Sequence, residues 1–163
     1  MTGDWRKWSL DDLLPHRPPM VLIDAVEAFD AEARSLKARV VITPEQMFFL
    51  RGRSGGGVPS WAAIEYMAQA SAALVGLWDR MQTPERPSRP GLLLGTRRLE
   101  LRLDRFEEGG TYHVTAENAF CDSDAASFAC AIMDDDGKEV ATATLNAYRP
   151  PDIAQFLKEQ TGK

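Results

Sequence analysis

Glu65 and Gln69 are a carboxylic acid and an amide within an otherwise mostly apolar stretch, GVPSWAAIEYMAQA at residues 57–70. Four residues apart on a helix, they project from one face and can hydrogen-bond to each other or to a ligand. A carboxyl group among apolar neighbours loses hydration and keeps a proton available for donation. The spacing favours a general acid at Glu65 that Gln69 orients. The alternative is a structural Glu65, satisfied by a backbone donor or by an Arg at an interface.

The start of the same predicted helix offers a place for negative charge. Unpaired backbone N–H groups near Ser60 and Trp61 carry partial positive charge and can point at an oxygen anion. Pro59 suits this boundary because proline has no N–H group to leave unsatisfied. We therefore expect Pro59, Ser60 and Trp61 to help bind a substrate oxygen.

Two imidazoles are the candidates for a base, and they stand in different surroundings. His16 lies beside Arg17, Pro18 and Pro19, where a short helix gives way to an extended segment. From there its side chain can reach the N-terminal end of the long helix. Alternatively, His16 and Arg17 tie the N-terminal segment to the sheet by hydrogen bonds. His113 occupies a polar position of a predicted strand, which favours a solvent-facing side chain without a role.

The elements that must position these groups follow from hydrophobic periodicity. Residues 60–79 are apolar nearly all round, which predicts a buried core helix. A short helix is expected at about 9–14, where Ser9 and Asp12 have capping-box spacing. Predicted strands cover 20–29, 35–42, 91–103, 111–120, 126–135 and 138–149, and residues 51–57 are glycine-rich and flexible or tightly turned. Tight turns among the last four strands predict a meander, so we expect an α+β fold in which an antiparallel sheet of about six strands wraps around one long central helix.

Composition excludes several classes of protein. The 163 residues suit one domain, 1–163, with a core at about 9–149 and a short C-terminal tail at 150–163. A formal charge of -5 argues against nucleic-acid binding. Cys121 and Cys130 form no metal-binding or disulfide pattern, so we expect no metal site and reduced thiols in a cytoplasm. No segment resembles a signal peptide or a membrane span.

Two motifs resemble one known family. LPHRPPMVLIDAV at 14–26 and VPSWAAIEYMAQA at 58–70 are similar to segments of the β-hydroxyacyl-acyl-carrier-protein dehydratases of the hotdog fold, and most closely to the dehydratase-like subunits of aryl-polyene biosynthesis clusters. The resemblance implies a hotdog fold, elimination of water from a 3-hydroxyacyl thioester, and a substrate carried on the phosphopantetheine arm of an acyl carrier protein without another cofactor. It also implies a homodimer or a heterodimer with a homologous hotdog subunit, whose active sites combine residues of both chains.

The chain departs from the family on the loop before the long helix. The family's catalytic loop His, fourteen residues ahead of the Glu, is Arg51 here, and the Gly after the helix-opening Pro is Ser60. Either His16 serves as the base, or a partner subunit supplies the His. A non-catalytic partner subunit and a hotdog thioesterase that uses Glu65 as a general base are the competing hypotheses. Arg51 and Arg53 are candidates for contacts with a carrier protein or its phosphopantetheine phosphate, and equally for solvated loop charges, as are Arg97 and Arg98.

Overall fold

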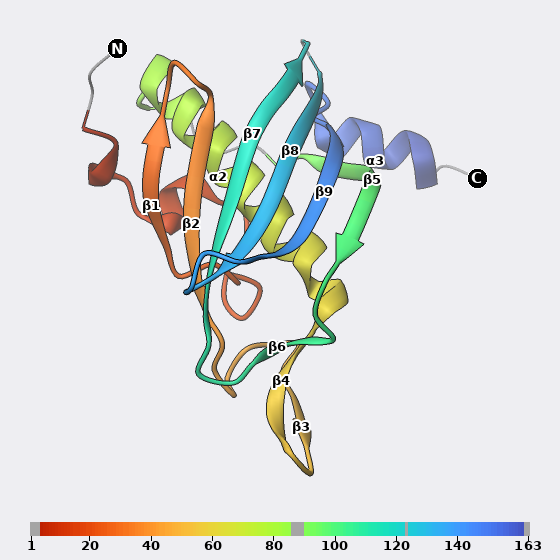
Figure 1. Ribbon diagram of the computed structural model, residues 1–163. Coiled ribbons are helices and arrows are strands. Elements are labelled where there is room, and N and C mark those ends of the chain that lie inside the picture. Colours follow the sequence, from red (N-terminus) through yellow and green to blue (C-terminus); the bar gives the residue numbers. More distant parts are fainter. Residues whose placement is uncertain (1–3, 86–89, 123, 162–163) are drawn as a thin grey trace.

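The computed structural model of the chain describes residues 4–85, 90–122 and 124–161. A six-stranded antiparallel sheet, ordered β1-β2-β7-β8-β9-β5, curves around the long helix α2 (Figure 1). This confirms the predicted α+β architecture. The strands are β1 (Ala25–Asp30), β2 (Ser35–Val41), β5 (Leu92–Leu101), β7 (Thr111–Cys121), β8 (Ala125–Asp134) and β9 (Glu139–Tyr148).

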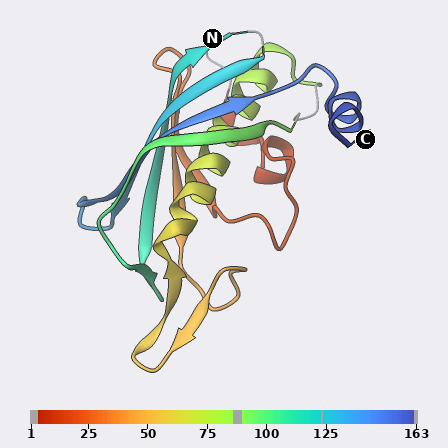
Figure 2. The ribbon, with the colours of Figure 1, turned by 90° about the vertical axis from the view of Figure 1, so that its right-hand side faces the viewer.

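Helix α2 (Ala63–Gln82) lies on the concave side of the sheet (Figure 2). A 3-10 turn, η2 (Ser60–Ala62), precedes it, and the helix continues past the predicted end at residue 79. Its buried side chains recur every three to four residues, the period of a helix face that packs against a sheet. Met67 and Leu77 are fully buried in this way, and they form part of one continuous core with strands β2, β7, β8 and β9.

The predicted alternation of β7 is confirmed over most of the strand. Tyr112, Val114 and Ala116 are buried, and Glu117 on the opposite face is exposed. Phe120 was predicted to face the core, but 57% of its surface is exposed. The pairing with β8 shifts register between Asn118 and Phe120, and such a bulge reverses which face the following side chains occupy.

The predicted meander is correct for β7, β8 and β9 but wrong for β5. Strand β5 pairs with β9 at the sheet edge, where Leu92 lies opposite Tyr148. Between β5 and β7 the chain forms a short strand, β6 (Arg105–Glu107), which belongs to a second sheet. Strands β5 and β7 are therefore not joined by a hairpin turn.

This second sheet is built on a hairpin of β3 (Leu50–Gly52) and β4 (Gly55–Pro59), which projects from one end of the domain (Figures 1 and 2). The glycine-rich segment is therefore a tightly turned hairpin. Gly55 has φ +108°, which favours glycine, and a Cβ added at Gly57 would lie 2.3 Å from the carbonyl oxygen of Phe106 on the neighbouring strand. The glycines thus allow β4 and β6 to pair closely.

The N-terminal segment begins with a 3-10 turn, η1 (Trp5–Lys7), and continues into α1 (Leu10–Leu13). The predicted capping interaction is present, because the Asp12 carboxylate accepts hydrogen bonds of 2.8 Å from the Ser9 N–H and hydroxyl groups. These bonds lower the pKa of Asp12. The strand predicted from residue 20 begins only at Ala25, since Met20 and Leu22 bind the Gln69 side chain of α2 instead of a neighbouring strand.

The C-terminal residues, predicted to be a short tail, include a helix, α3 (Ile153–Thr161), none of whose side chains is buried. Within the described residues, no helix is long and apolar enough to cross a membrane.

Gly76 of α2 allows α1 to approach closely, and its replacement gives a test of this packing. A Cβ at Gly76 would lie 2.4 Å from the carbonyl oxygen of Leu13. Helix propensity alone predicts that Gly76→Ala stabilises the protein by about 0.5–1 kcal/mol. We expect destabilisation instead, by about 1–3 kcal/mol, because the backbone of α1 must move. Urea denaturation measures the sign, and a stabilised variant would contradict the close contact.

Candidate active site

A pocket of about 250 Å³ lies between one face of α2 and strands β5, β8 and β9. Its α2 wall is formed by Glu65, Ala68, Ser71, Ala72 and Val75, which recur at helical spacing over roughly 15 Å of helix. The opposite wall carries Leu93, Ala126, Phe128, Leu145 and Ala147. The pocket is thus a mostly apolar channel with the half-buried side chain of Glu65 on its wall, and Asp122, Asp124 and Arg149 also line it.

His16 lines the same pocket as Glu65, although 49 residues separate them in the sequence. Burial lowers the pKa of the His16 imidazole, and the nearby charge of Glu65 opposes this shift only in part. The imidazole is therefore neutral at neutral pH, as a base must be. Its Nδ1 atom is buried and has no hydrogen-bond partner among the described residues. An unsatisfied buried polar atom costs about 1–3 kcal/mol, and a water molecule or a substrate atom in the pocket can satisfy it.

Gln69 fixes the segment that carries His16. Its Oε1 atom accepts a hydrogen bond of 2.8 Å from the Leu22 N–H group, and its Nε2 atom donates one of 2.5 Å to the Met20 carbonyl oxygen. The side chain is 1% exposed. We expected Gln69 to orient Glu65 or to bind substrate, but the structure places its amide against the backbone of residues 20–22. Gln69 therefore positions the loop after His16.

The hydrogen bonds of Arg17 lie within its own segment and do not reach the sheet, as was considered for His16 and Arg17 together. Its guanidinium group donates to the carbonyl oxygens of Leu14, at 3.0 Å, and of His16, at 2.7 Å. These bonds stiffen the segment through the backbone and leave the His16 ring free to face the pocket.

The start of the long helix is arranged differently from the prediction. The Ser60 N–H group donates to the carbonyl oxygen of Asp104 at 3.1 Å, so it is not available to a substrate oxygen. Pro59, Ser60 and Trp61 do not line the pocket of Glu65 and His16. The Trp61 side chain packs edge-on against Phe48, with ring centroids 5.1 Å apart, and remains 52% exposed. Within one chain, the expected oxyanion site and the acid are thus not brought together.

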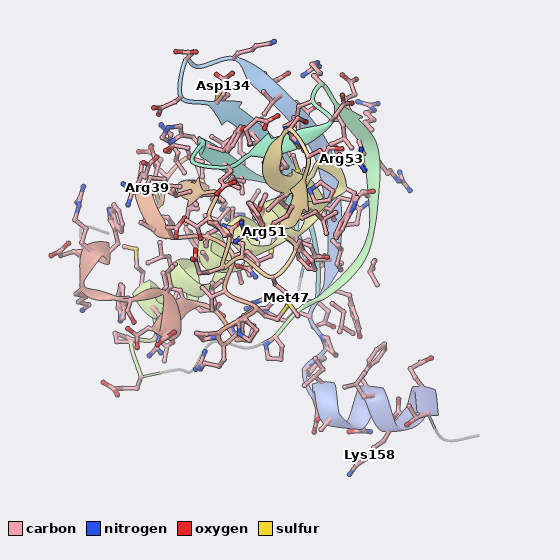
Figure 3. The ribbon with its side chains drawn as sticks, turned by 90° about the horizontal axis from the view of Figure 1, so that it is seen from below. Arg39, Met47, Arg51, Arg53, Asp134 and Lys158 are labelled. Carbon is pink, nitrogen blue, oxygen red and sulfur yellow. The ribbon has the colours of Figure 1, made fainter. Side chains whose placement is uncertain are left out.

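Arg51 and Arg53 lie on the projecting hairpin, outside the pocket (Figure 3). Both side chains are exposed. The Arg51 guanidinium carbon lies 5.8 Å from the centre of the Phe49 ring. This end of the molecule also exposes Met47 and Leu50, so cationic and apolar side chains share one surface.

The remaining candidates lie away from the pocket. His113 faces outward from β7, but it is not without partners: Nδ1 lies 2.7 Å from a Glu27 carboxylate oxygen and Nε2 lies 3.2 Å from one of Asp135. Arg97 and Arg98 are on β5, where Arg98 has φ 54° beside a register shift. A larger, shallow hollow of about 710 Å³ covers the outer face of β1, β2, β7 and β8, and none of the candidate catalytic residues lines it.

Sequence reasoning did not single out the small side chains that make the channel. Ala68, Ser71 and Ala72 share the helix face of Glu65, at three, six and seven residues from it, and the helical repeat would have found them. Ser71 donates to the Met67 carbonyl oxygen and lies 3.5 Å from the Cys130 sulfur, whose pKa is raised to about 11 by burial. Among the described residues, no group of three or more acidic, His or Cys side chains is placed to hold a metal ion.

Comparisons with known proteins place the chain in a family. The sequence profile of the ApeP-like family, described as ApeP dehydratase, matches residues 8–158. The 3-hydroxyacyl-[acyl-carrier-protein] dehydratase FabZ of Chlamydia pneumoniae is 36% identical over 95 residues, which make up 58% of this chain and 60% of that protein. The chain thus matches about three fifths of the length of this curated relative.

Solved structures agree with the fold. A chain of the dehydratase heterocomplex ApeI:P from Xenorhabdus doucetiae has 29% identity and a TM-score of 0.79, covering 91% of this chain and 96% of that chain. A thioesterase-like protein related to phenylacetic acid degradation, from Ralstonia eutropha, has 24% identity and a TM-score of 0.56, covering 76% and 83%. At that identity the likeness shows the fold alone.

The antiparallel sheet wrapped around α2 defines a hotdog-fold protein. The chain belongs to the ApeP-like dehydratase family. The resemblance to hotdog dehydratases, and to the subunits of aryl-polyene clusters, is thereby confirmed.

Proposed function

We propose that the chain eliminates water from a 3-hydroxyacyl group carried on the phosphopantetheine arm of an acyl carrier protein. The observation that carries this proposal is that a carboxyl group, Glu65, and a neutral imidazole, His16, line one apolar pocket. Dehydration needs such a pair, since one group must remove the C2 proton and another must protonate the leaving hydroxyl group. No further cofactor takes part in this chemistry.

In the proposed reaction, the His16 imidazole accepts the proton from C2 of the thioester. The electron pair of that C–H bond forms the C2–C3 double bond, and the C3–O bond breaks. Glu65, as the general acid, supplies a proton to the departing oxygen, so the products are an enoyl thioester and water. The channel of small side chains beyond Glu65 holds the acyl chain away from water.

A second chain completes the site in this proposal. Trp61, at the N-terminal end of the helix, and the hairpin that carries Arg51 and Arg53 lie outside the pocket. In the proposed assembly they lie at a surface between subunits, where a substrate that enters from a carrier protein contacts them. The arginines suit a phosphate or an acidic carrier surface. Strand β5 is an edge strand of ten residues, and it exposes Leu93, Leu94 and Leu101. A long apolar edge strand favours pairing with another strand.

In this proposal the partner is a hotdog subunit, and the similar chain from Xenorhabdus doucetiae belongs to the dehydratase heterocomplex ApeI:P. A heterodimer also accommodates the second candidate function, in which this chain supports a partner that carries the loop His and contributes no catalytic group itself. The observation in favour of that candidate is Arg51, which stands where the family has its base. We place the reaction in the cytoplasm.

Mass spectrometry of the carrier-bound product tests the proposal. The purified chain, alone and mixed with a homologous hotdog chain that has the loop His, is incubated with a 3-hydroxyacyl carrier protein. We expect the acyl group to lose one water molecule while remaining attached to the carrier. Release of the free carrier thiol would instead show hydrolysis, and an unchanged acyl group under both conditions would refute the proposed dehydration.

A further inference from the structure

The C-terminal helix α3 has an apolar face that its own chain leaves largely uncovered. Ile153, Phe156 and Leu157 recur at the spacing of one helix face. Ile153 and Phe156 are only half-buried, and Leu157 is 48% exposed. Phe156 contacts Tyr148, with ring centroids 5.5 Å apart. The opposite face is polar, and there the Gln155 amide donates to the Glu159 carboxylate at 3.0 Å.

A helix of this length needs packing to persist. Isolated helices shorter than about 12–15 residues are marginal in water, and most helical stability in proteins comes from burial of an apolar face. Helix α3 has nine residues, none of them buried. A surface outside this chain is therefore the natural cover for Leu157 and its neighbours.

The position of α3 indicates what that surface belongs to. Tyr148, which contacts Phe156, pairs with Leu92 at the start of edge strand β5. From there α3 extends past the β5 edge of the sheet (Figure 1) and on the side that carries α2 (Figure 2). Figure 3 shows α3, marked by Lys158, standing clear of the rest of the domain. On β5 itself, Leu93 and Leu94 are 42% and 65% exposed.

The free edge of β5 determines the geometry of a partner. Antiparallel pairing of two such edges is related by a two-fold axis perpendicular to the sheet, and this axis keeps both long helices on the same side. An element that extends past β5 on that side then lies over the partner subunit. A partner that binds β5 must therefore meet α3 as well.

We propose that α3 is a docking element, whose Ile153, Phe156 and Leu157 face packs on the hotdog subunit that pairs with β5. The inference rests on the two-chain assembly of the proposed function and adds the surface that strengthens it. The occupant of the apolar face is a second hotdog subunit, which contacts both the edge of β5 and this face of α3.

Sedimentation equilibrium measures the assembly. The sample is the chain alone or, where it is monomeric alone, the chain with the loop-His hotdog chain of the same organism. We expect Leu157→Glu to weaken subunit binding at least about tenfold, because an unpaired charge enters the interface. Removing residues 152–163 has the same effect without a mutated side chain. The matched control is Lys158→Gln, which changes the charge equally on the polar face and leaves the affinity unchanged.

A β5 variant separates the two proposals. Leu94→Lys places a charge on the strand edge and weakens the assembly whether or not α3 takes part. Should Leu94→Lys weaken binding while Leu157→Glu and the truncation do not, the docking role of α3 is overturned and the assembly stands. If no variant alters binding, or no assembly forms, both proposals fail. Circular dichroism confirms that each variant is folded before its affinity is interpreted.

Discussion

Replacing Glu65 by Gln lowers the rate of enoyl formation by about 1,000-fold, the middle of the range for loss of a general acid. The amide keeps the size and polarity of the side chain but has no proton to give to the leaving hydroxyl group. Glu65 lies on the wall of an apolar channel, so water cannot easily take its place. Rapid-quench assays with a 3-hydroxyacyl carrier protein measure this rate directly.

Substrate binding serves as the control for this variant. Because Gln has nearly the shape of Glu, we expect the affinity for the 3-hydroxyacyl carrier protein to stay within about threefold of the original protein. Glu117→Gln makes the same carboxyl-to-amide change at an exposed position of β7 outside the pocket, and it should leave the rate nearly unchanged. A Glu65→Gln variant with the original rate would favour the supporting-subunit function.

Replacing His16 by Gln lowers the rate by about 100-fold and changes its dependence on pH. Burial holds the pKa of the imidazole below its ordinary value of 6.5. A base must be neutral, so the rate of the original protein falls as the pH drops through that lowered pKa. The variant lacks this acidic limb, and the pH profile of kcat/KM measures the difference.

The same shift predicts the pH dependence of stability. A group whose pKa is lower in the folded state binds fewer protons there than in the unfolded chain, so stability decreases as the pH falls below the unfolded value of about 6.5. His16→Gln should flatten this part of the stability profile. If His16→Gln keeps both the original rate of enoyl formation and the acidic limb of the kcat/KM profile, the base comes from another residue. A His of the partner subunit is then the remaining candidate.

The place of Glu65 on a long, mostly buried helix was predictable because its signal is local. Glu65 stands out as a carboxyl group within a helix whose period is visible over twenty residues, and the bond between Ser9 and Asp12 spans only three positions. Such patterns depend on neighbours along the chain. The alternation of β7 was predictable for the same reason.

The features that sequence reasoning missed depend on contacts between distant segments. Whether His16 faces the pocket depends on the Gln69 amide, which holds residues 20–22 from 47 positions away. The Ser60 N–H group is occupied by Asp104, and nothing near Ser60 in the sequence indicates that bond. The placement of β5 beside β9 follows from the detour through β6. No local pattern specifies any of these contacts.

The central claim is that Glu65 and His16 act on one substrate in one pocket, and a double-mutant cycle tests it most directly. Two groups that act together in a single step lose their effects non-additively, because the second replacement removes little once the first has disabled the step. We predict that the Glu65→Gln, His16→Gln double variant forms enoyl product within about threefold of the rate of the slower single variant. A double variant slower by the product of the two single effects would contradict the claim.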